Sequence, residues 1–169
     1  MQRRRDFEEF YAANYGRVAA LVAAVVGDKD EADDIAQETF ARALARWPRL
    51  SGYELPEAWV RQVAMRMAVD SVRRVRRMTR MLPVLRAASR GAEPDLASGL
   101  QFSALGRALA GIPFREREVI VLHYVADLTV EQIAADRGIP VSTVRARLAV
   151  GRRRLERALE PDQEASRDA

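Results

Sequence analysis

Apolar residues recur along this chain at intervals of three and four, and the alternation typical of a half-buried strand is nearly absent. The spacing predicts helices over residues 6–26, 31–47, 57–77, 100–111 and 114–126, with a final helical pair from residue 128 onward. Residues 48–56 carry two prolines and a glycine, which indicates a loop. The chain is therefore expected to be all-α.

The composition changes in the middle of the chain. The stretch LRAASRGAEPDLASG, residues 85–99, is small and polar, contains glycine and proline, and is typical of a flexible linker. We expect two small helical domains over residues 1–82 and 100–160. A flexible linker over 83–99 would join them, and a polar tail over 161–169 would follow.

Several classes of site are excluded by composition. The chain has no cysteine, so disulfides and thiolate zinc sites are excluded, and with one histidine, His123, the common metal and acid–base constellations are hard to assemble. We predict a structural role for His123 and no catalytic residue, metal or cofactor. The apolar run at 18–27 is too short to cross a bilayer, and the first residues lack a signal-peptide core, so we expect a cytoplasmic protein without membrane insertion.

The stretch LTVEQIAADRGIPVSTVRARL, residues 128–148, predicts two short helices joined by a tight turn. Thr129 and Gln132 have the spacing of a capping box at the start of the first helix. Gly138 stands where the chain needs a left-handed residue to turn, and Pro140 suits the start of the next helix. These features favour a helix-turn-helix that reads DNA.

The second of these helices has two distinct faces. Val144 and Leu148 mark the buried stripe, while Ser142, Ala146 and Ala149 lie opposite, where small residues allow close approach to base edges in a major groove. The residues predicted to contact DNA are Ser142, Thr143, Arg145, Arg147, Arg152 and Arg153. The alternative is an ordinary helical hairpin with a solvated charged face. The net charge of +4 does not decide between the two, so the placement of the arginines carries the prediction.

Three blocks occur in a characteristic order: DDIAQETF at 33–40, AWVRQVAMRMAVDSVRR at 58–74 and GIPVSTVRARLAVGRRRL at 138–155. Together they resemble regions 2 and 4 of the extracytoplasmic-function sigma factors, a group of the sigma-70 family. The resemblance implies a transcription initiation factor and not an enzyme. It would bind core RNA polymerase, recognise the −35 and −10 promoter elements and assist promoter opening. It also suggests an anti-sigma partner and a free monomer.

The resemblance assigns roles to individual residues. It sets the acidic face of the second helix against polymerase: Asp33, Asp34, Gln37 and Glu38. Without the resemblance, a solvated acidic face with intrahelical pairs such as Glu38 to Arg42 would be the better interpretation. It places the following residues at the −10 element: Tyr53, Arg61, Arg66, Asp70, Arg73, Arg74 and Arg77. Tyr53 could stack on a flipped base, and Trp59 is assigned to core packing. Arg66 stands where family members often have asparagine, so it is expected to contact phosphate or to be plain surface charge.

Two other functions are compatible with parts of the sequence. A stand-alone helix-turn-helix regulator would be a dimer on a palindromic site, yet no dimer seam is visible and the DDIAQETF block would be unexplained. A nucleic-acid enzyme could use Asp33, Asp34 and Glu38 to hold magnesium. No converging carboxylates occur elsewhere to complete such a site.

Overall fold

The structure is a computed structural model that describes residues 2–81 and 104–160, and these residues are helical with no strand. The helices are α1 (Gln2–Val26), α2 (Lys29–Leu50), α3 (Pro56–Met81), α5 (Ala104–Ala110), α6 (Phe114–Ile120), the π-helical turn η1 (Val121–Val125), α7 (Val130–Arg137) and α8 (Val141–Leu159). The all-α prediction is confirmed. The predicted linker 83–99 and tail 161–169 lie outside the described residues.

Helices α1, α2 and α3 form the N-terminal half. The Asp28 side chain accepts a hydrogen bond from the Glu31 backbone N–H at 2.8 Å, which fixes the start of α2. Phe7 meets Trp47 edge-on, with ring centroids 5.2 Å apart, and Val22 is fully buried. Burial of these aromatic and branched side chains holds the three helices together.

The predicted loop at 48–56 is shorter than expected, because α2 continues through Pro48 to Leu50. Proline lacks an N–H and normally disfavours the helical conformation of the residue before it. Here Pro48 lies in the last turn of α2, between Trp47, which is 6% exposed, and Leu50, which is 1% exposed. Burial of these two side chains on either side of the proline outweighs its local preference.

The buried face of α3 is not marked by its largest side chains. The fully or almost fully buried residues of α3 are Val60, Ala64, Met65, Ala68, Val69 and Ser71, whereas Trp59, Val63 and Met67 are only partly buried. Small alanines allow α1 and α2 to approach α3 closely, so its core face is not marked by its largest residues. Leu44 of α2 and Tyr11 of α1 are also large, yet they are 51% and 38% exposed.

Helices α7 and α8 form the predicted helix-turn-helix. The Thr129 hydroxyl accepts from the Gln132 backbone N–H at 3.1 Å, and the Gln132 side chain accepts from the Thr129 N–H at 2.9 Å. Gly138 has φ +63°, the left-handed conformation that ends α7. Val144 and Leu148 are buried. The capping box, the turn and the buried stripe are all confirmed.

The predicted helix 114–126 changes its hydrogen bonding at its end. After Ile120 the chain forms one π-helical turn, closed by the Ala126 N–H donating to the Val121 carbonyl at 3.0 Å. His123 Nδ1 lies 2.7 Å from the Leu128 carbonyl oxygen and ties this turn to the loop before α7. The hydrogen bond supports the structural role predicted for His123.

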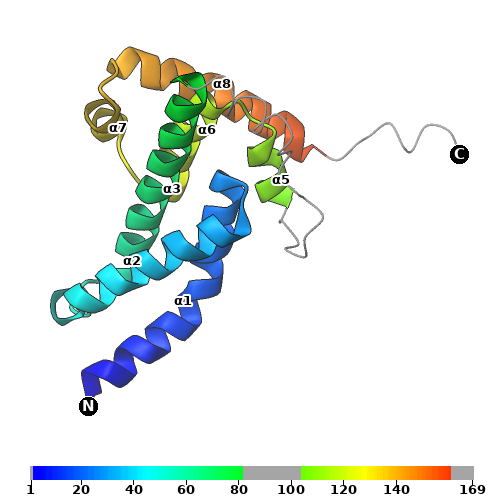
Figure 1. Ribbon diagram of the computed structural model, residues 1–169. Coiled ribbons are helices and arrows are strands. Elements are labelled where there is room, and N and C mark those ends of the chain that lie inside the picture. The colour runs from blue at the N-terminus through cyan, green and yellow to red at the C-terminus, as the bar shows by residue number, and fades with distance from the viewer. Residues whose placement is uncertain (1, 82–103, 161–169) are drawn as a thin grey trace, which may run out of the picture.

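The N-terminal half and the C-terminal half (α5–α8) pack against each other. Figure 1 shows α3, in green, running from α1 and α2 toward α6 and α8, with α8 lying across the far end. Helix α1 contacts α5, α3 contacts η1, and one cluster of buried residues includes side chains from both halves. The sequence predicted two tethered domains, and it did not predict this contact between them.

Candidate functional site

Helix α8 presents the surface predicted to read DNA. Ser142, Arg145 and Ala146 are exposed, and Thr143 and Arg147 are partly buried. Arg145 Nη2 lies 3.6 Å from Glu131 Oε1 of α7, and both side chains are about two-thirds exposed. An ion pair between two exposed side chains contributes little free energy, so Arg145 can leave Glu131 and bind another anion.

The basic surface continues toward the end of α8. Arg152 and Arg153 are both exposed, as predicted. Arg152 Nε lies 3.6 Å from Glu156 Oε1, one helical turn further along, and both side chains are 62% exposed. Arg153 makes no ion pair with the described residues. These side chains extend the positive surface beyond the small residues of the first turns.

The acidic residues of α2 lie on the outside of the N-terminal half. Asp34, Gln37 and Glu38 are exposed and Asp33 is partly buried. Glu38 Oε1 accepts a hydrogen bond from Arg42 Nε at 2.8 Å, which is an intrahelical pair with both side chains about half exposed. The structure therefore brings the four predicted residues together on one accessible helix surface.

Tyr15 of α1 belongs to the same surface, and sequence reasoning missed it. Burial raises the pKa of the Tyr15 hydroxyl, and the nearby Asp33 carboxylate raises it further, while a hydrogen bond with Gln37 lowers it. Its ring stacks on Tyr11, with centroids 4.9 Å apart. The spacing of four between Tyr11 and Tyr15 was the available signal, since such residues share a helix face.

The loop after α2 borders a small cavity of about 270 Å³. It is lined by Arg46, Arg49, Leu50, Tyr53 and Trp59. Trp59 packs against the core, as predicted, but it also lines this cavity. The Arg46 guanidinium lies 5.6 Å from the Trp59 ring centroid, a cation–π distance. Sequence reasoning identified Tyr53 but neither arginine.

The residues of α3 predicted to contact the −10 element are mostly turned toward the C-terminal half. Arg61 donates to the Val125 carbonyl at 3.0 Å and to Asp127 at 3.2 Å. Arg66 Nε lies 2.9 Å from Asp136 Oδ2. Two further ion pairs link α3 to the C-terminal half: Asp70 with Arg137, and Arg73 with Glu118. Arg74 and Arg77 are exposed.

Glu118 and Arg137 form the most buried charged pair among the described residues. Their side chains are 3% and 4% exposed, and Arg137 Nε lies 3.6 Å from Glu118 Oε1. Arg73 Nε lies 3.1 Å from the same oxygen, but in neither contact do the atoms align as in a hydrogen bond. Burial raises the pKa of Glu118, and the charges of Arg73 and Arg137 oppose that rise. Since Arg137 follows the buried Ile133 by four positions, its burial could have been predicted from spacing.

The described residues offer neither a metal-binding cluster nor a membrane-spanning helix. Residues 2–81 and 104–160 contain no group of three histidine, cysteine, aspartate or glutamate side chains placed to hold a metal ion. Within the same ranges, no helix combines the length and the apolar character needed to span a membrane.

Comparison with known families gives two matches in the same order as the two halves. Residues 10–78 match the family described as Sigma-70 region 2. Residues 102–155 match the family described as Sigma-70, region 4. The first match runs from within α1 to the last turns of α3, and the second includes α5, α6, α7 and most of α8.

Known proteins resemble the chain over most of its length. The chain is 31% identical over 166 residues to a probable RNA polymerase sigma-C factor of Mycobacterium bovis, covering 94% of this chain and 85% of that protein. It is 26% identical over 155 residues to the extracytoplasmic-function sigma factor SigW of Bacillus subtilis, covering 85% and 83%.

Among solved structures, the fold is similar to the sigma factor RpoE of Bartonella quintana, which was crystallised in complex with the anti-sigma factor NepR. The TM-score is 0.56 at 22% identity, covering 94% of this chain and 99% of that one. At this identity the likeness concerns the fold alone. The two family matches, together with 31% identity over 166 residues to the extracytoplasmic-function sigma factor SigC of Mycobacterium tuberculosis, covering 94% of this chain and 85% of that protein, show that this chain belongs to the extracytoplasmic-function sigma factors of the sigma-70 family.

Proposed function

We propose that this sigma factor directs RNA polymerase to promoters through three surfaces: the acidic face of α2, the loop cavity with the basic side of α3, and the exposed face of α8. The observation that carries the proposal is the form of α8. Its buried Val144 and Leu148 fix the helix on α7, so Ser142 and Arg145 are presented to solvent. A helix held in this way can enter a major groove, as in other helix-turn-helix proteins.

On α8, short and long side chains would contact different parts of the DNA. Ser142 and Thr143 are short and lie in the first turn, where a recognition helix comes closest to base edges. Arg145, Arg152 and Arg153 are long and exposed, which suits contacts with phosphates on either side of the groove. Arg147, partly buried, would reach phosphate from the edge of the helix.

The cavity beside Tyr53 would accept an unpaired base of the −10 element. Tyr53 is 54% exposed and shares the cavity with Trp59, so an inserted base could stack on an aromatic ring. Such stacking contributes about 1–3 kcal/mol per base, which offsets much of the few kcal/mol that extrusion from the duplex costs. Arg46 and Arg49 at its edge would neutralise the phosphates of the displaced strand.

The acidic face of α2 would bind core polymerase. Asp34, Gln37 and Glu38 offer acceptors to arginines of a partner helix. Tyr11 and Leu44 are exposed apolar side chains on α1 and α2, and they would supply the apolar contacts that such an interface needs at its centre.

Promoter binding through both halves would require them to separate, because Arg61, Arg66 and Arg73 are engaged with the C-terminal half. The pairs of Arg61 and Arg66 join side chains that are each about a third or more exposed, so each contributes at most about 1 kcal/mol, whereas Arg73 meets the buried Glu118. Polymerase binding would have to supply the free energy that opens the contact. Arg66, held by Asp136, would be released to a phosphate.

The remaining expectations form part of the same proposal. The domain boundaries are 1–82 and 100–160, with a linker over 83–99 between them. The free chain is a cytoplasmic monomer that acts without a catalytic residue, metal or cofactor. An anti-sigma factor would also bind its acidic and basic surfaces, and it would thereby compete with polymerase or with promoter DNA.

The test is capture of purified core RNA polymerase by the tagged protein. A variant with Asp34→Arg and Glu38→Arg is expected to lose most of the captured polymerase, because two acceptors become repulsive cations. The matched control reverses two exposed acidic residues of α1, Asp6→Arg and Glu9→Arg, and should bind nearly as the wild type does. Circular dichroism checks that all three are helical.

Two results would contradict the proposal. Equal capture by the α2 variant and the wild type would exclude the acidic face as the polymerase surface. A wild-type protein that ignores core polymerase, dimerises and protects a palindromic DNA site would favour a stand-alone regulator.

A further inference from the structure

A cavity of about 410 Å³ lies between the last turns of α3 and the helices α6 and α8. Its volume falls within the roughly 300–1,000 Å³ that is usual for ligand pockets. It is lined by Arg73, Arg76, Arg77, Arg80, Phe114, Arg115, Glu118, Ile139 and Arg147. Because its walls come from both halves of the chain, the cavity exists only while the halves are packed together.

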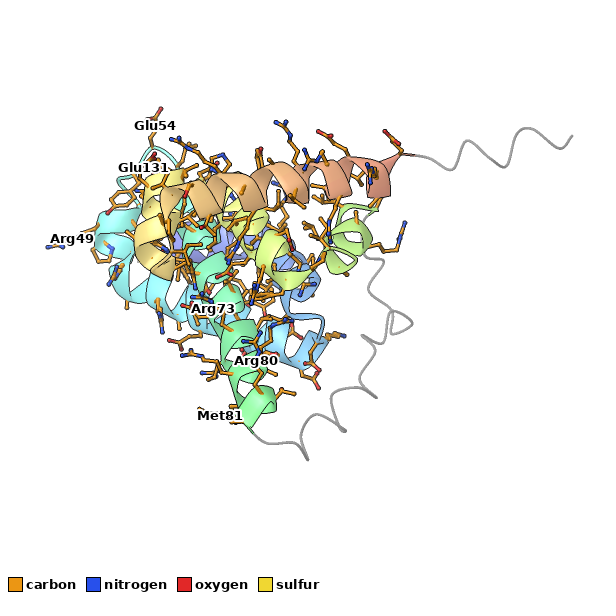
Figure 2. All side chains as sticks on the ribbon, turned by 90° about the horizontal axis from the view of Figure 1, so that it is seen from above. Arg49, Glu54, Arg73, Arg80, Met81 and Glu131 are labelled. Carbon is orange, nitrogen blue, oxygen red and sulfur yellow. The ribbon has the colours of Figure 1, made fainter. Side chains whose placement is uncertain are left out.

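The lining carries an unusual excess of positive charge. Four arginines of α3, at positions 73, 76, 77 and 80, are spaced by three and four and share one helix face. Figure 2 labels Arg73 and Arg80 on α3, which ends at Met81. Arg115 of α6 and Arg147 of α8 complete the basic walls.

Little in the described chain neutralises these charges. Glu118 is the one carboxylate in the lining, and it is already shared by Arg73 and Arg137. Arg77, Arg80 and Arg115 make no ion pair with any described residue. Like charges held this close repel one another, so an anion entering the cavity would be strongly favoured.

Some of the walls are fixed in place. The Arg76 guanidinium lies 5.1 Å from the Phe114 ring centroid, and that of Arg117 lies 5.7 Å from the same ring. These cation–π contacts reduce the freedom of Arg76 before any ligand arrives. A guanidinium that is already oriented loses less entropy on binding a ligand.

We propose that this arginine cavity binds a compact polyphosphate, such as the phosphate chain of a nucleotide. Arginine matches phosphate oxygens with paired N–H donors, and a chain of linked phosphates brings several negative charges into one small volume. The backbone of a nucleic acid offers the same phosphates. It fits less well, because the ligand must lie between the two halves while Arg66 and Arg73 are engaged across their contact.

A ligand at this site would affect the whole molecule. Since it touches both halves, it would stabilise their packed arrangement, and the stabilisation would grow with the logarithm of its concentration above the dissociation constant. It would also occupy Arg73, Arg77 and Arg147, which are predicted promoter contacts. The binding itself needs neither polymerase nor promoter, so its test is independent of the proposed sigma function.

Isothermal titration of the full chain with sodium tripolyphosphate, at constant ionic strength, tests the site. We expect one ligand per chain. The double variant Arg76→Gln, Arg115→Gln should bind at least about tenfold more weakly, because two charge-assisted contacts are lost. The matched control, Arg5→Gln with Arg17→Gln, removes two exposed charges from α1 and should bind as the wild type does. If the first variant unfolds, Arg80→Gln tests the same wall at an exposed position.

The outcomes separate the two sources of phosphate. A single-stranded oligonucleotide is titrated in parallel into the same three proteins. Tripolyphosphate binding that depends on Arg76 and Arg115 supports the site. Absence of tripolyphosphate binding, or equal binding by all variants, overturns the proposal. The proposal is also overturned if the oligonucleotide binds in a way that depends on Arg76 and Arg115 while tripolyphosphate does not bind. That result would assign the cavity to nucleic acid.

Discussion

Arg137→Met removes one member of the buried pair that stands where the two halves meet. The Arg137 side chain is 4% exposed and contacts Glu118 within the C-terminal half and Asp70 of α3. Methionine keeps much of the aliphatic volume, so the change removes charge and hydrogen bonds more than packing. Glu118, 3% exposed, would then be left with Arg73 as its only neighbouring partner among the pairs of the described chain.

The expected magnitude follows from this burial. Removing one partner of a buried ion pair costs about 3–5 kcal/mol, because the other charge stays buried. The lower value applies here, since Arg73 remains 3.1 Å from Glu118 Oε1 and Asp70 is exposed enough to be solvated. We therefore expect a loss of about 3 kcal/mol in the free energy of unfolding. With a slope of roughly 2 kcal/mol per molar urea, the midpoint falls by roughly 1.5 M.

Urea unfolding followed by circular dichroism measures this change. The two tryptophans, Trp47 and Trp59, both lie in the N-terminal half, so their fluorescence tells whether that half unfolds with the rest. The control Arg145→Met breaks an exposed pair and should cost less than about 1 kcal/mol.

A second substitution tests the cause. Adding Glu118→Leu to Arg137→Met replaces the whole pair with apolar side chains, which is often neutral, so most of the lost stability should return. If the double variant is as unstable as the sum of the two single variants, or if Arg137→Met costs no more than Arg145→Met, the reasoning about buried charge is refuted.

Three further predictions concern stability. Gly151→Ala should lower the melting temperature, because its new Cβ would lie 2.8 Å from Ile120 Cγ1 and overpacking costs about 1–3 kcal/mol. The helical control Gly16→Ala meets no atom within 4 Å and should raise it. Thr129→Ala should lower the free energy of unfolding in urea by about 1 kcal/mol through loss of the capping box. Because burial raises the pKa of Glu118, folding favours its protonated form. Its contribution to stability is present below the ordinary glutamate pKa and lost as pH rises through the raised pKa. A pH series of melting temperatures should show this fall in the wild type and not in Glu118→Gln, and identical profiles would contradict it.

Local signals in the sequence were sufficient for the elements of the fold. The capping box at Thr129, the left-handed Gly138 and the stripe of Val144 and Leu148 act over a few residues, so their effect can be read from spacing alone. The acidic face of α2 was predicted for the same reason, since residues three and four apart share a helix surface.

The contacts between elements were not predictable in this way. The partners of Arg61, Arg66 and Arg73 lie more than forty positions away in the chain, and no local pattern pairs them. Helix α2 continues through Pro48 because tertiary burial of its neighbours overrides a local preference. The cavity beside Tyr53 likewise depends on Trp59 of the next helix, which spacing had assigned to packing alone.

The most direct measurement is transcription by core RNA polymerase on sheared genomic DNA from the source bacterium, with the RNA 5′ ends sequenced. With this protein added, discrete start sites should appear that share two upstream motifs, at the −35 and −10 positions. The Asp34→Arg, Glu38→Arg variant should not produce them. Start sites identical to those of core polymerase alone would contradict the conclusion that this chain is a promoter-specificity factor.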